Sequence, residues 1–162
     1  SEQYEAADTE RETAITTRTA VSSGWSNVEQ EEREVLKGLI EWYKGDGYST
    51  EQESDNKASY TMNKDGKAVK LMLLPKNNSG YNIEISEDGK IVKTVAVIKT
   101  DLDKKRFVIS EAQWNLSKRN DVQHSIYLVS RQGESMSQVV IDDLRERIRD
   151  GSARAVPGVI YY

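Results

Sequence analysis

The chain has 162 residues, no cysteine, one histidine and a formal net charge of −4. Its length allows one domain with a substantial core, and its lack of cysteine excludes disulfides, thiolate metal sites and a cysteine nucleophile. The composition favours an intracellular location, cytoplasmic or nuclear, and no apolar run approaches the ~20 residues of a membrane span, so no membrane partner is expected.

The N-terminal segment differs in composition from the rest. Residues 1–24 are rich in Glu, Thr, Ser and Ala, so we expect an acidic, disordered linker or extension followed by one globular domain over residues 25–162. The first 34 residues hold nine acids and three arginines, whereas the remaining 128 hold 20 bases and 18 acids. The region expected to fold is therefore close to neutral, unlike a dedicated nucleic-acid-binding domain.

A first helix is predicted from Ser26 to Gly45. Ser26 and Glu29 fit a capping box, and Gly45 and Gly47 end the helical pattern. The apolar residues at helical spacing are Val28, Val35, Leu36, Leu39, Ile40 and Tyr43.

Two β-hairpins are predicted next, from Ala58 to Leu74 and from Gly80 to Thr100. Their turns are Asp65-Gly66 and Asp88-Gly89, pairs that suit the positive φ angles of a type I′ turn. One face of the first hairpin is apolar, with Tyr60, Met62, Val69, Leu71 and Leu73.

The turn of the second hairpin predicts its register and its two faces. Pairing outward from the turn sets Glu87 opposite Lys90, Glu84 opposite Lys93 and Asn82 opposite Val95. The face expected to be buried carries Tyr81, Ile83, Ile85, Val92, Ala96 and Ile98. Asn82, Val97 and Lys99 are expected on the other face, where a site would lie.

The C-terminal third alternates short strands and helices. The predicted elements are a strand from Arg106 to Ile109, a helix from Ser110 to Lys118 that begins with a Ser110/Gln113 capping box, a strand from Ser125 to Arg131 and a helix from Ser137 to Asp150. The apolar tail from Ala155 to Tyr162 is expected to pack back on the domain or to dock on a partner. The fold class is therefore α+β: a central mixed sheet built on hairpins and flanked by an N-terminal, a short middle and a C-terminal helix.

This order of motifs resembles the restriction-endonuclease-like superfamily of PD-(D/E)xK nucleases, in particular the domain found at the C-terminus of NO VEIN-type proteins. The resemblance covers roughly residues 28 to 131. The strings that carry it are Gly80-Tyr81-Asn82-Ile83, Ala96-Val97-Ile98-Lys99-Thr100, the segment from Phe107 to Trp114, and Ile126-Tyr127-Leu128-Val129.

The resemblance implies a catalytic site whose acidic residues are missing here. The metal-binding aspartate of the family falls on Asn82 and its glutamate on Val97, so only Lys99 is retained. A valine cannot bind Mg²⁺ and an amide oxygen binds it weakly. Glu84 or Glu111 could in principle replace a carboxylate, although Glu84 has a simpler role opposite Lys93.

Two further readings of charged side chains stay open at this point. Glu32 lies toward the apolar stripe of the first helix, where a helical glutamate supplements the metal site in some nucleases of this fold; it is also an ordinary acid of a first helical turn. Lys99 is either a phosphate-facing or ligand-facing group or a solvated lysine near a sheet edge. The candidate binding residues are Lys93, Lys99, Gln113, Arg145 and Arg149.

Three hypotheses of function follow. The first is a catalytically degenerate nuclease-like module that binds nucleic acid or assists assembly in a larger DNA-, RNA- or chromatin-associated complex, without cofactor. The second is a domain that binds only protein, through a sheet edge or the C-terminal tail. The third is an active Mg²⁺-dependent nuclease with relocated carboxylates.

Overall fold

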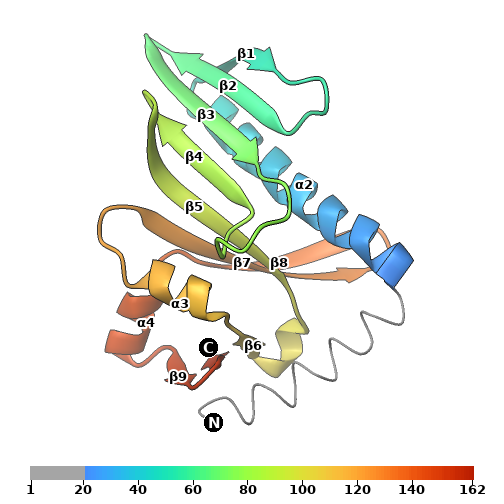
Figure 1. The fold of residues 1–162 in the computed structure, drawn as a ribbon, viewed down its shortest axis with the longest axis vertical. Coiled ribbons are helices and arrows are strands. Elements are labelled where there is room, and N and C mark those ends of the chain that lie inside the picture. Colours follow the sequence, from blue (N-terminus) through green and yellow to red (C-terminus); the bar gives the residue numbers. More distant parts are fainter. Residues whose placement is uncertain (1–20) are drawn as a thin grey trace.

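A long helix packs against one face of a seven-stranded sheet in the computed structural model, which describes residues 21–162 and their side chains from Glu29 onward (Figure 1). The helix, α2 (Val21–Gly45), begins earlier than the capping box at Ser26 predicts. The first twenty residues of the predicted linker lie outside the described residues. The apolar stripe of α2 is confirmed, since Val35, Leu36, Leu39 and Ile40 are all buried.

The large sheet is mixed, as predicted. Its strand order is β1-β2-β3-β4-β5-β7-β8, and every neighbouring pair is antiparallel except β5 with β7. The strands are β1 (Ser49–Glu53), β2 (Ser59–Lys64), β3 (Lys67–Leu73), β4 (Ile83–Glu87), β5 (Lys90–Lys99), β7 (Gln123–Gln132) and β8 (Ser135–Ile141). The parallel pair requires a long connection, which contains α3 (Glu111–Ser117).

The second face of the sheet is covered at β5, β7 and β8 by the C-terminal part of the chain. A three-stranded sheet with the order β6-β10-β9 lies there together with α3 and α4 (Figure 1). Its strands are β6 (Arg106–Val108), β9 (Arg154–Val156) and β10 (Val159–Tyr161), and the remaining helices are η1 (Leu102–Lys104) and α4 (Leu144–Asp150). The C-terminal tail therefore packs back on the domain, one of the two predicted outcomes.

Both predicted hairpins are confirmed, and their turns use the expected residues. Asp65 and Gly66 have φ angles of 49° and 84°, and Asp88 and Gly89 have 50° and 84°. These positive values are those of the type I′ turn that Asp-Gly favours. Lys64 pairs with Lys67, and the predicted apolar face of the first hairpin lies in the core beneath α2.

The register of the second hairpin differs from the prediction by one residue because β5 contains a bulge. Ile85 pairs with Lys93 and Ser86 with Ile91, so Val92 has no partner. Beyond the bulge, Ile83 pairs with Val95 in place of the predicted partner Asn82. The predicted pairing with Asn82 put Val95 on the face opposite the buried one, and this is wrong: Val95 is fully buried with Ile83 beneath α2.

The predicted C-terminal helix is also partly wrong. Residues 135–141 form β8, which pairs antiparallel with β7, and α4 begins only at Leu144. A strand explains the burial pattern better, since Ile141 is buried and Gln138 is exposed. The predicted stop is correct, because Gly151 caps α4 in the left-handed conformation with a φ of 84°.

Candidate functional site

Three elements meet at the Asn82 side chain. The Asn82 Nδ2 atom donates a hydrogen bond of 2.9 Å to Glu32 Oε1 on α2. The Asn82 Oδ1 atom accepts a hydrogen bond of 2.6 Å from the backbone N–H of Val97 on β5. We call these three residues the Asn82 site. It joins the helix to the position on β5 where the family resemblance places a metal-binding glutamate.

The backbone around Asn82 is held from both sides. Its N–H donates to Val95 O and its C=O accepts from Leu74 N–H, both at 2.8 Å, so Asn82 links β5 to the end of β3. Gly80, two residues earlier, has a φ of 90° and lies against the first turn of α3. An added Cβ would lie 3.0 Å from backbone atoms of Ala112 and Gln113. Only glycine fits this approach, and the approach fixes the loop that carries Asn82.

The electrostatics of the site are set by partial burial of Glu32. Desolvation raises the pKa of this carboxyl above its ordinary value, and repulsion from Glu29 raises it further. Lys76, Arg33 and the hydrogen bond from Asn82 act in the opposite direction. Glu32 is thus a half-buried carboxylate whose close hydrogen-bond donor is an uncharged amide, an arrangement that supplies one possible ligand for a cation.

The other two members of the site offer little to a metal ion. One Asn82 oxygen lone pair is already directed at the Val97 amide, and Val97 has a half-buried apolar side chain that packs on the core beneath α2. Over the described part of the chain, no three His, Asp or Glu side chains gather as a set of metal ligands. The alternative carboxylate Glu84 pairs with Thr94, not with Lys93, and accepts a hydrogen bond of 3.1 Å from the Tyr81 hydroxyl.

Lys99 lies two residues beyond Val97 on β5, beside Val129 of β7. Its side chain is exposed and forms no ion pair or hydrogen bond with any residue from Glu29 onward. Of the charged residues in the predicted binding set, Lys99 is the one whose side chain has no ion pair or hydrogen bond with any residue from Glu29 onward.

The other predicted binding residues lie elsewhere and have local partners. Lys93 is 4.0 Å from the Asp142 carboxylate, and Arg149 pairs with Glu146 at 2.5 Å on α4. Arg145 donates to the Asn120 side chain. Gln113 Oε1 accepts from the Ser110 N–H at 3.0 Å, which completes the predicted capping box. The structure therefore does not bring these residues together with Lys99.

One charged cluster could not be predicted from the sequence. Glu31 is only 1% exposed and binds Arg131 of β7 through two hydrogen bonds, of 2.6 and 3.0 Å. Glu34 also accepts from Arg131. The cluster joins α2 to β7 across 100 positions of sequence, and no local pattern indicates such a pair.

Comparison with models of known protein families, with curated proteins and with solved structures found no match to this chain. Within residues 21–162, no helix combines the length and the apolar character that crossing a membrane would require.

Proposed function

We propose that this chain is a catalytically degenerate nuclease-like module that acts as a nucleic-acid-binding or assembly domain of a larger complex. The observation that carries the proposal is the bonding of Asn82. At the position where the family resemblance puts a metal-binding aspartate, both polar atoms of an amide are used by Glu32 and by the Val97 N–H. Hydrogen bonds within the protein thus use both polar atoms of the side chain at the expected metal-binding position.

The order of elements supports the nuclease-like part of the proposal. The N-terminal helix α2 packs on an antiparallel meander of β3, β4 and β5, and α3 then leads to β7, which runs parallel to β5. Asn82 immediately precedes β4, and Val97 and Lys99 lie near the end of β5. These are the relative places that the resemblance leads us to expect for the motif.

The distribution of cations limits the affinity that such a module could have for nucleic acid. Lys93, Arg119, Arg145 and Arg149 are each bonded to an acidic or amide side chain, whereas Lys99 is exposed and unpaired within the described residues from Glu29 onward. Within the predicted set of binding residues, a single unpaired cation can neutralise only about one phosphate. We therefore propose weak, salt-sensitive contact with a phosphate backbone at Lys99, with assembly supplied by other surfaces.

A gel-shift titration against single- and double-stranded DNA and RNA over a range of salt tests this function. Binding should weaken as salt rises, and Lys99→Ala should lower both the affinity and the magnitude of the salt slope, by about one phosphate contact. Lys70→Ala is the matched control, because Lys70 is also an exposed strand lysine but lies on β3. Equal effects of the two substitutions would exclude a specific role of Lys99.

Two other outcomes would change the assignment. If no nucleic acid binds even at low salt, the domain that binds only protein becomes the better description. The pairing of Lys93 with Asp142 and of Arg149 with Glu146 favours this second candidate. Cleavage that is lost with EDTA and with Lys99→Ala would instead indicate an active Mg²⁺-dependent nuclease with relocated carboxylates.

A further inference from the structure

The three-stranded sheet carries a row of two arginines with a tyrosine between them. Tyr161 of β10 pairs with Arg106 of β6 on one side and with Arg154 of β9 on the other. The neighbouring residues Phe107 and Ile160 are buried in the core of the C-terminal part. Since side chains alternate along a strand, the two arginines and the tyrosine lie on the opposite face, away from that core. We call these three residues the arginine–tyrosine row.

The two tyrosines at the end of β10 each lie beneath a cation. The guanidinium carbon of Arg154 lies over the Tyr161 ring, 4.6 Å from its centroid, and Lys105 Nζ lies over the Tyr162 ring at 5.7 Å. Arg154 and Lys105 are both exposed, and neither forms an ion pair with an acid from Glu29 onward. A cation held over an aromatic ring is oriented without losing its charge. Both cations can therefore still bind an anion.

The segments that build this sheet carry only positive side-chain charge. Residues 104–110 and 151–162 contain no Asp or Glu, and their basic residues are Lys104, Lys105, Arg106 and Arg154. The nearby acids Asp101 and Asp103 lie at η1, where Asp101 Oδ1 accepts a hydrogen bond of 3.0 Å from the Asp103 N–H. The chain as a whole has a net charge of −4. A local positive excess on an otherwise acidic chain favours a polyanionic ligand at this sheet.

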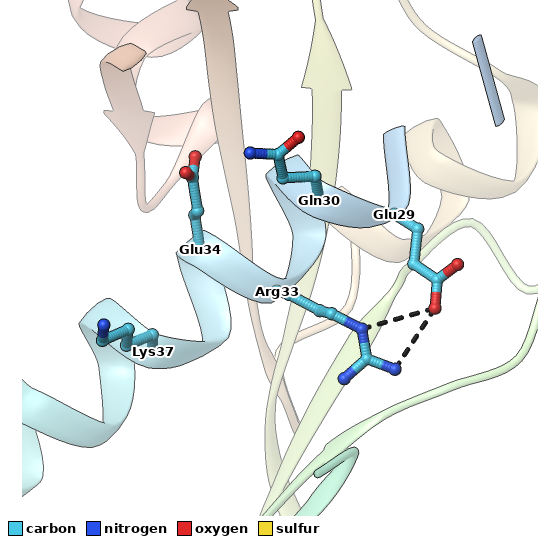
Figure 2. A pocket seen from close by; sticks show the side chains of 5 residues that line it. All are labelled: Glu29, Gln30, Arg33, Glu34 and Lys37. Atoms are coloured by element: carbon cyan, nitrogen blue, oxygen red, sulfur yellow. Dashed lines mark hydrogen bonds and ion pairs between the residues drawn. The ribbon is translucent and has the colours of Figure 1, made fainter. Parts of the chain in front are cut away.

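The pocket on the surface of α2 offers no comparable site for a polyanion. It is lined by Glu29, Gln30, Arg33, Glu34 and Lys37, which mix acids with bases (Figure 2). Arg33 donates there to the Glu29 carboxylate from two of its nitrogens, at 3.3 and 3.2 Å. The acids of this pocket would repel phosphates, so the distribution of charge favours the three-stranded sheet.

We propose that the arginine–tyrosine row and Lys105 form a binding surface for single-stranded nucleic acid. Bases of the strand stack on the Arg154 guanidinium held over Tyr161, and Lys105 contacts phosphates, with Arg106 adding positive charge beside them. Unpaired bases stack on arginine planes as well as on aromatic rings, whereas the bases of a duplex are already stacked on one another. An acidic peptide would use the charges of this surface but not its capacity for stacking.

This inference rests on the proposed function, because it names the nucleic acid and extends the contact beyond Lys99. Thr100, the next residue after Lys99, donates a hydrogen bond of 3.4 Å from its hydroxyl to the Arg106 carbonyl. The end of β5 therefore lies beside β6, and Figure 1 shows β6 close to β9 and to the C-terminus. One bound strand can thus contact both Lys99 and the three-stranded sheet.

Fluorescence anisotropy of the full chain with a labelled oligothymidylate of about 15 nucleotides tests the inference. Arg154→Lys keeps the charge but loses the planar guanidinium. Its dissociation constant for the oligothymidylate should rise about fivefold, whereas that for inorganic polyphosphate, which has no bases, should stay the same. Arg154→Ala should weaken the binding of both ligands, that of the oligothymidylate about tenfold. Arg119→Ala is the matched control, since Arg119 is an exposed arginine paired with Asp121, and it should change neither constant.

The outcomes separate this inference from the proposed function. Absence of binding to single and double strands at low salt would exclude both. If Arg154→Lys binds the oligothymidylate like wild type while Lys99→Ala binds it more weakly, the nucleic-acid function stands and the row is not its surface. Polyglutamate that displaces the oligothymidylate as well as polyphosphate does would indicate a general anion surface and overturn the inference. Circular dichroism checks that the Arg154 variants fold, which we expect because this side chain is exposed.

Discussion

Asn82 Nδ2 and Glu32 Oε1 lie 2.9 Å apart although the two residues are 50 positions apart in the sequence. The donor is an uncharged amide where the family resemblance expects a carboxylate. Asn82→Asp would therefore place two carboxylates in hydrogen-bond contact at a half-buried position. We expect this variant to lose roughly 1–3 kcal/mol of stability at neutral pH, because two close negative charges repel and the donor is lost.

The same variant should respond to protons and divalent cations. Either a shared proton or a bound Mg²⁺ or Mn²⁺ would relieve the repulsion, so denaturant unfolding of Asn82→Asp should show recovery at acidic pH and on addition of the ion. Asn82→Ala is the control: it loses the hydrogen bond to Glu32, and also the one from the Val97 N–H that Asp can keep, but it adds no charge. If the ions stabilise both variants equally, the Asn82 site cannot be a latent metal site.

Glu32→Gln should change the pH dependence of stability. Burial raises the pKa of Glu32 in the folded state above 4.5, its ordinary value. Between 4.5 and the raised pKa of the folded state, the folded protein binds the Glu32 proton more tightly than the unfolded chain does. The free energy of unfolding therefore falls as pH rises through this window. Glutamine can still accept the bond from Asn82 but does not ionise, so the variant should be more stable than wild type above the window. Urea unfolding across the acidic range, with exposed Glu51→Gln as the control, checks this expectation.

Local rules predicted the parts of the fold that local chemistry determines. Asp-Gly pairs gave both hairpins because those residues accept positive φ, and Ser110 with Gln113 gave the start of α3 because a capping box is complete within four residues. The bulge at Val92 has no such signal. One unpaired residue shifted the predicted partners of Asn82 and Glu84, because strand faces alternate with every residue.

Contacts between residues far apart in the sequence determine the parts of the fold that local sequence patterns did not predict. The run from Ser137 to Asp150 fits helical spacing through Val140, Ile141 and Leu144, but pairing with β7 makes its first part a strand. β1 was not predicted because all five of its residues are exposed and none is a large apolar residue. In the site, the hairpin pattern predicted that Asn82 and Val97 lie on adjoining arms of one hairpin, whereas the bond of Asn82 to Glu32 depends on how α2 crosses the sheet.

Arg131→Met should be among the most destabilising substitutions. It would leave the Glu31 carboxylate, which is 1% exposed, without its bidentate partner, at a cost of about 3–5 kcal/mol. The double variant with Glu31→Leu should recover most of that loss, because an apolar pair needs no compensating charge. Arg149→Met is the control, since its pair with Glu146 is exposed and should contribute less than about 1 kcal/mol. Guanidinium unfolding of the three variants and wild type measures these differences.

Gly80→Ala should destabilise the protein more than Gly66→Ala. Both glycines have positive φ angles, 90° and 84°, so both substitutions incur backbone strain of about 1–2 kcal/mol. Only at Gly80 would the new Cβ also press on backbone atoms of α3, at 3.0 Å. Gly80→Ala should additionally speed hydrogen exchange of the Val97 amide, because the loop that carries Asn82 must move. Equal stability losses would show that α3 does not fix this loop.

His124 should make the fold sensitive to acid. Its Nδ1 atom lies 2.8 Å from Thr94 Oγ1, and its Nε2 atom is buried without a hydrogen-bond partner among the described residues. Burial lowers the pKa of His124 to about 4 from 6.5. Because the folded state favours the neutral ring, the contribution to stability is complete above pH 6.5 and is lost as pH falls through about 4. The loss is on the order of 3 kcal/mol.

His124→Gln tests this origin of the acid sensitivity. The amide can keep a hydrogen bond to Thr94 but cannot gain a proton. As pH falls from 6.5 to 4, the variant should therefore become more stable relative to wild type. Glu32 changes the stability in the opposite direction over part of this pH range, since its contribution to the free energy of unfolding grows as pH falls. The double variant with Glu32→Gln removes both effects and should give the flattest profile. A difference between wild type and His124→Gln that is independent of pH would show that His124 gains its proton without cost, and hence that water reaches the ring in the folded state.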